Sequence, residues 1–119
     1  PGLNDHELPA ILAAAAEAGA RTAAYVPVRL PLAVAPLFEA WLERHFPDRK
    51  EKVIGRIRSM RGGKLNDPRF GSRMEGEGFF AEQLDKLFEL AKRRAGFSGD
   101  FPWITTEHFR VPTPQLELF

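Results

Sequence analysis

One short segment constrains the fold of this chain more than any other, because it has the pattern of a β-strand among helical patterns. Residues 22–29 place Val26 and Val28 around Tyr25, directly after a glycine-containing turn, which favours a buried strand. Pro27 cannot donate a backbone hydrogen bond and favours an edge position. A lone strand leaves its backbone groups unpaired, and the chain offers no clear second strand. We therefore expect a mainly α chain with one or two short strands, and a piece of a larger α/β protein that contains the missing strands.

Helical periodicity covers most of the remaining chain. It predicts helices over about 5–18, after Pro31 as far as Phe46, over 47–60 and over about 79–95. The side chains predicted to face inward are Leu8, Ile11, Leu12 and Ala15, then Val34, Leu37, Phe38, Trp41, Leu42 and Phe46, then Val53, Ile54, Ile57 and Met60, and finally Phe80, Leu84, Leu87, Phe88 and Ala91.

Two segments lack a regular period. Residues 61–78 hold five glycines and Pro68, which predicts a long loop, with Leu65, Phe70 and Met74 as anchors to the core. The segment after residue 96 is expected to be irregular. Its aromatic side chains are candidates for a strap over the helices: Phe97, Phe101, Trp103 and Phe109.

Composition excludes several kinds of chemistry. The chain has no cysteine, which removes disulfides, thiolate nucleophiles and cysteine-ligated metals. Its three histidines, at positions 6, 45 and 108, are too dispersed to predict a metal site. No apolar run is long enough to span a bilayer and the Ala-rich segment near the start lacks a basic flank, so we expect a cytoplasmic chain without a membrane partner.

The formal net charge is only +1, but the cations are concentrated. Between Arg44 and Arg73, Lys and Arg outnumber Asp and Glu by ten to three. Such a segment attracts phosphate-rich partners. The alternative is that these residues form a solvated helix face and a charged loop.

Three segments together resemble a known family. They are "PGLNDHELPAILAAAAEAGA", "YVPVRLPLAVAPLFEAWLERHFPDRKEKV" and "RGGKLNDPRFGSRMEGEGFFAEQLDKLF". In this order they look like the C-terminal part of radical S-adenosylmethionine proteins of the spore-photoproduct-lyase-like group, also described as DNA repair photolyase-like. The resemblance covers nearly the whole chain, and its most specific part is the loop over 61–78.

The resemblance implies a C-terminal fragment of a partial (β/α) barrel. Residues 1–30 would be its last helix–strand unit, 31–96 a helical extension that contains the 61–78 loop, and 97–119 an irregular tail. The lone strand would then pair with strands of the missing N-terminal barrel.

Chemistry in such barrels takes place at the carboxyl ends of the strands. The resemblance therefore implies that Asn4 and Arg29 lie near the S-adenosylmethionine and substrate cavity. The alternative is that Asn4 only caps a helix and Arg29 is only a surface charge. The 4Fe-4S cluster of the family is held by three closely spaced cysteines that this chain lacks. Cluster and S-adenosylmethionine are therefore expected in the parent protein, and this chain alone should be inactive. The alternative is a parent protein that has lost this chemistry.

The parent is expected to be a lyase-like enzyme that acts on nucleic acid. The loop would contact phosphates through four cationic side chains, Arg61, Lys64, Arg69 and Arg73, while its glycines allow close backbone approach. Alternatives are that the loop only packs against the barrel, or that the chain is a non-catalytic helical module that binds nucleic acid or protein.

The last five residues, "QLELF", resemble the peptide by which bacterial replication and repair proteins bind the DNA polymerase sliding clamp. Gln115 would be the polar anchor, and Leu116, Leu118 and Phe119 the apolar part. Two prolines in residues 111–114 favour an extended stem. The alternative is a tail that docks on its own core through Leu116 and Phe119.

Overall fold

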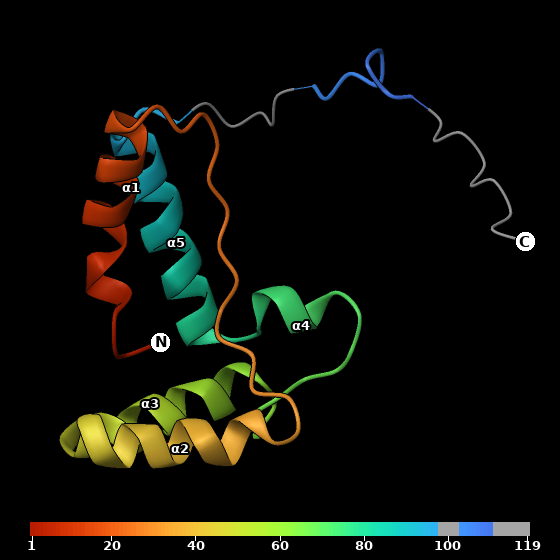
Figure 1. Ribbon diagram of the computed structural model, residues 1–119. Helices are drawn as coiled ribbons and strands as arrows, with labels where there is room; N and C mark the ends of the chain where they lie inside the picture. Colours follow the sequence, from red (N-terminus) through yellow and green to blue (C-terminus); the bar gives the residue numbers. More distant parts are fainter. Residues whose placement is uncertain (98–102, 111–119) are drawn as a thin grey trace, which may run out of the picture.

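The computed structural model of the chain describes residues 1–97 and 103–110, and this part is mainly helical, as the sequence predicts (Figure 1). Its elements are a 3-10 helix η1 (Asp5–Glu7), followed by α1 (Leu8–Glu17), α2 (Val34–His45), α3 (Pro47–Met60), α4 (Ser72–Glu75) and α5 (Phe79–Arg94). Helices α1 and α5 lie side by side, and α2 and α3 form a second pair beneath them (Figure 1). The helix predicted over 47–60 is confirmed at both ends.

Each helix pair has its own small core. Leu12 of α1 packs with Phe88 and Ala91 of α5, and Phe97 closes the end of this pair. The second core is formed by Leu30, Leu42, Val53, Ile54 and Ile57. The stripe predicted for α3 is buried throughout because its spacing places these side chains on one face of the helix, toward α2 and α5.

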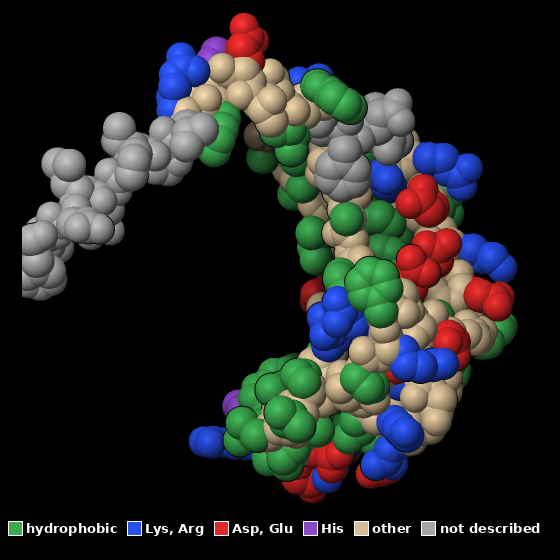
Figure 2. Space-filling view, turned by 90° about the vertical axis from the view of Figure 1, so that its right-hand side faces the viewer, with side chains coloured by type: hydrophobic (Ala, Val, Ile, Leu, Met, Phe, Trp, Pro, Cys, Tyr) green, Lys and Arg blue, Asp and Glu red, His purple; other side chains and the backbone are tan. Residues whose placement is uncertain are grey.

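The stripe predicted for α2 is only partly buried. Leu42 is fully buried and Phe38 packs at the edge of the core, but Leu37 is 69% exposed and Val34, Trp41 and Phe46 are exposed too. Hydrophobic side chains gather at the lower end of the view in Figure 2, where α2 lies. The prediction was wrong for these positions because α2 packs mainly on one helix, α3, which covers only one of its faces.

The predicted strand over residues 22–29 is not formed in the described residues, where no strand occurs. The segment runs as an extended stretch beside α5 (Figure 1). A strand needs a hydrogen-bonded neighbour, and within the described residues the backbone groups of 21–30 bond to no other backbone group. The expectation of one or two strands is therefore wrong for residues 1–97 and 103–110.

The side chains of this segment nevertheless alternate as those of a strand do. Ala23, Tyr25 and Pro27 are partly or fully buried, and the Tyr25 ring centroid lies 4.6 Å from that of Phe88. Ala24, Val26 and Val28 are exposed. One face of the segment is thus covered by α5, and the other is more exposed, although Val26 and Val28 still line a groove with Leu8 and Ile11 of α1.

Two of the three predicted loop anchors were wrong, and so were two of the predicted strap aromatics. Leu65 packs on the second core, but Phe70 is 93% exposed and Met74 is also exposed. Phe97 is buried, whereas Trp103 and Phe109 are exposed; Phe101 lies outside the described residues. The loop is held by polar contacts instead.

Candidate functional site

Arg61 is the structural centre of the predicted phosphate-binding loop. Its side chain is 3% exposed and donates hydrogen bonds to the carbonyls of Ser72 and Arg73 at 3.1 and 2.8 Å. It also reaches the carbonyls of Pro27 and Val28 at 3.2 and 3.4 Å. Burial lowers the pKa of Arg61, while Asp67 opposes this shift. The guanidinium joins the loop to the extended segment, so it is committed to carbonyl groups of the chain.

A second polar network closes the loop. Both carboxylate oxygens of Asp67 accept hydrogen bonds from the Arg69 guanidinium, at 2.8 to 3.2 Å, and one also accepts the Ser72 hydroxyl at 2.7 Å. These hydrogen bonds hold the pKa of Asp67 well below its usual range. Arg69 also pairs with Glu77 at 3.0 Å. Its charge is therefore largely neutralised by two carboxylates.

The four predicted phosphate contacts thus differ in availability. Lys64 is exposed. Arg73 lies with its guanidinium carbon 5.4 Å from the Phe70 ring centroid, and its buried Nε has no hydrogen-bond partner among the described residues. Arg61 faces inward and Arg69 is paired. The structure brings Arg61, Arg69 and Arg73 into one folded loop, but leaves few free cationic donors on its surface.

Asn4 and Arg29, implied by the resemblance to lie near a cofactor cavity, lie at the ends of η1 and of the extended segment. The Asn4 side chain makes no capping hydrogen bond. The Asn4 backbone carbonyl accepts the Glu7 amide. Asn4 lines a groove of about 250 Å³ together with Tyr25 and Val28. Arg29 is exposed, and its Nη1 contacts the Met74 sulfur at 3.7 Å. The two side chains share no pocket in the described part of the chain.

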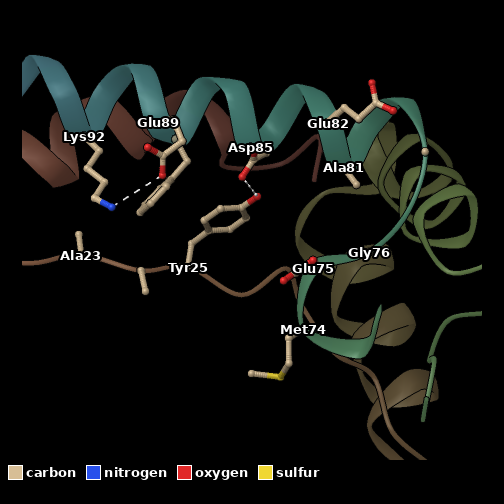
Figure 3. Close-up of a pocket in the computed structure, with 13 residues that line it drawn as sticks. Ala23, Tyr25, Met74, Glu75, Gly76, Ala81, Glu82, Asp85, Glu89 and Lys92 are labelled. Carbon is tan, nitrogen blue, oxygen red and sulfur yellow. Dashed lines mark hydrogen bonds and ion pairs between the residues drawn. The ribbon is translucent and has the colours of Figure 1, made fainter. Parts of the chain in front are cut away.

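A cavity of about 520 Å³ lies between α5, the extended segment and the end of α4 (Figure 3). Tyr25 points across it toward Asp85, to which its hydroxyl donates at 3.4 Å. Burial and the nearby Asp85 carboxylate raise the pKa of Tyr25 to about 12. Glu82 and Glu89 add negative charge on the same helix. Lys92 lines the cavity too and pairs with Glu89 at 3.7 Å, so the lining has a net negative charge but is not purely acidic. The spacing of these carboxylates on α5 was a signal that sequence reasoning missed.

The remaining predictions concern the C-terminal peptide, metal binding and membrane spans. Residues 111–119, which include Gln115, Leu116, Leu118 and Phe119, lie outside the described residues. In the described part, no three histidine or carboxylate side chains gather as a metal site would require. None of its helices is both long and apolar enough to cross a membrane.

No protein family, curated protein or solved structure matched the chain.

Proposed function

We propose that this chain is the C-terminal part of a radical S-adenosylmethionine protein of the spore-photoproduct-lyase-like group, and that the parent protein acts on nucleic acid. The observation that supports this best is the extended segment over residues 22–29. It alternates buried and exposed side chains, follows helix α1 directly, and offers an unpaired edge.

This arrangement fits the last helix–strand unit of a partial barrel. In such a unit helices cover one face of the strand while its other face points to the barrel interior. Here α5 covers the Tyr25 face, and Val26 and Val28 occupy the more exposed face. Strands supplied by the parent protein would bond to the backbone groups of this segment that Arg61 does not already engage.

The residues of this chain do not fit the cofactor by themselves. The 4Fe-4S cluster of the family needs three cysteine thiolates, and the chain contains no cysteine. Both the cluster and the cysteines are therefore assigned to the missing barrel. Asn4 and Arg29 remain the residues proposed to face S-adenosylmethionine and substrate, because they stand at the ends of η1 and of the strand-like segment.

The test is to read the coding sequence upstream of Pro1 and to isolate the whole protein without oxygen. We expect three closely spaced cysteines, bound iron and cleavage of S-adenosylmethionine. A matched variant with those cysteines changed to alanine should lose the iron. A whole protein without these cysteines, and without iron, would instead favour the alternative of a non-catalytic helical binding module.

The C-terminal peptide supports a second candidate function, docking on the bacterial DNA polymerase sliding clamp. The sequence pattern of Gln115, Leu118 and Phe119 carries this proposal. Calorimetry of the full chain against a sliding clamp should give binding that Leu118→Ala with Phe119→Ala abolishes. If the unchanged chain fails to bind at high micromolar concentration, the tail does not dock there.

A further inference from the structure

A second cationic surface, separate from the loop, lies between the amino-terminal turn and α3. It is a groove of about 390 Å³. Its lining residues are Gly2, Leu3, Asp5, His6, Arg49, Lys52 and Arg56. None of them belongs to the 61–78 loop, so the groove is separate from the four loop contacts proposed above, although its cations belong to the basic segment between Arg44 and Arg73.

Helix geometry places three cations along one wall of this groove. Arg49, Lys52 and Arg56 are spaced by three and four residues, which puts them on a single face of α3. The buried face of α3, with Val53 and Ile57, points toward the core instead. The three charges therefore stand together beside the turn.

The turn lies close against this wall. Gly2 has φ +84°, a conformation that favours glycine, and a Cβ at this position would lie 3.0 Å from Arg56 Cδ, so a larger residue would displace the Arg56 side chain. Arg49 Nη1 donates to the Leu3 carbonyl at 3.4 Å, and Arg56 Nη1 donates to Asp5 Oδ2 at 3.4 Å. Each guanidinium thus donates one hydrogen bond to the turn and is held beside it.

The charge of the groove favours an anion. Three cationic side chains face one carboxylate, Asp5, and the described residues give Lys52 no ion pair. Arginine presents a planar fork of donors that matches phosphate oxygens, and lysine adds a compact positive charge. Arg56 is also held over the Phe80 ring, 4.8 Å from its centroid, which restrains its position.

We propose that this groove binds a phosphate group through Arg49, Lys52 and Arg56, beside the glycine turn. The proposal does not depend on the radical chemistry assigned above to the parent protein. The phosphate could belong to a nucleic-acid backbone or to a small phosphorylated molecule, and both sources use the same contacts.

The test titrates inorganic phosphate into the 15N-labelled full chain and records amide shifts. We expect saturable shifts of the amide signals of Gly2, Leu3 and residues 49–56 of α3. Lys52→Glu should weaken binding by about tenfold or more, because it removes one charge-assisted contact and adds repulsion. Arg58→Glu is the matched control, since Arg58 is exposed on the same helix and does not line the groove, and it should leave the affinity within about twofold.

A labelled single-stranded oligonucleotide then distinguishes the sources. If the oligonucleotide displaces phosphate from the groove, and Lys52→Glu weakens oligonucleotide binding more than Arg58→Glu does, the ligand is a nucleic-acid backbone. If phosphate binds and the oligonucleotide does not displace it, the ligand is a small phosphorylated molecule. Equal losses in the two variants, or shifts scattered over the surface, would overturn the proposal, because they would indicate general charge attraction.

Discussion

Replacing Arg61 by methionine tests the central contact of the fold. Methionine keeps much of the apolar contact of the arginine stem but removes every donor, so the four carbonyl groups of Pro27, Val28, Ser72 and Arg73 lose their partner. Each hydrogen bond from a charged donor contributes about 1.5 to 3 kcal/mol. Counting only the two shortest bonds, at the low end of that range, gives a loss of about 3 kcal/mol.

That loss is large beside the roughly 5 to 15 kcal/mol that stabilises a typical domain. In urea, with a slope of about 2 kcal/mol per molar, the unfolding midpoint should fall by about 1.5 M. The assay is circular dichroism at 222 nm, with Arg58→Met as the control for removal of an exposed charge. A midpoint for Arg61→Met that matches the control would refute the reasoning, since the buried guanidinium would then contribute nothing net.

Three further predictions address the core, the loop and the acidic cavity. Leu42→Ala should lower the free energy of unfolding by about 2 to 5 kcal/mol and Leu37→Ala by less than about 0.5 kcal/mol, measured in urea, because only Leu42 is buried. The folded-state pKa of Asp67 is lowered, so its stabilising effect is present above the unfolded-state value of about 4 and is lost as pH falls below it. Acid unfolding curves should show this loss of stability, and the loss should be smaller in Asp67→Asn. Tyr25 is the single tyrosine, so its ionisation can be followed by absorbance near 295 nm; its pKa should be about 12, and lower in Asp85→Asn. A midpoint near 10 in the unchanged protein would contradict the burial and hydrogen bond of Tyr25.

The helices could be predicted from sequence because their signals are local. Pro47 and the stripe of α3 define both ends and the buried face of that helix. The α2 stripe was less informative, since periodicity indicates an apolar face but not whether a neighbour covers it. Leu37 and Trp41 satisfy the pattern and are still exposed.

The loop could not be predicted in the same way, because its order comes from contacts between residues far apart in the sequence. From its sequence context, a glycine-rich loop, Arg61 is expected to be a free cation. In the structure its guanidinium donates to carbonyl groups that lie 34 residues before it and 12 residues after it. Among the loop cations, charge alone did not distinguish the buried Arg61 from the exposed Lys64. The basic face of α3, by contrast, follows directly from helical spacing.

The measurement that tests the proposal most directly is amide hydrogen exchange over residues 22–29, in this chain and in the proposed parent protein. In this chain those amides should exchange rapidly while those of α5 stay protected, because the segment has no backbone partner among the described residues. In the whole protein, strand pairing should slow them by about a hundredfold or more. Equally rapid exchange in both proteins would contradict the assignment of this segment as a barrel strand.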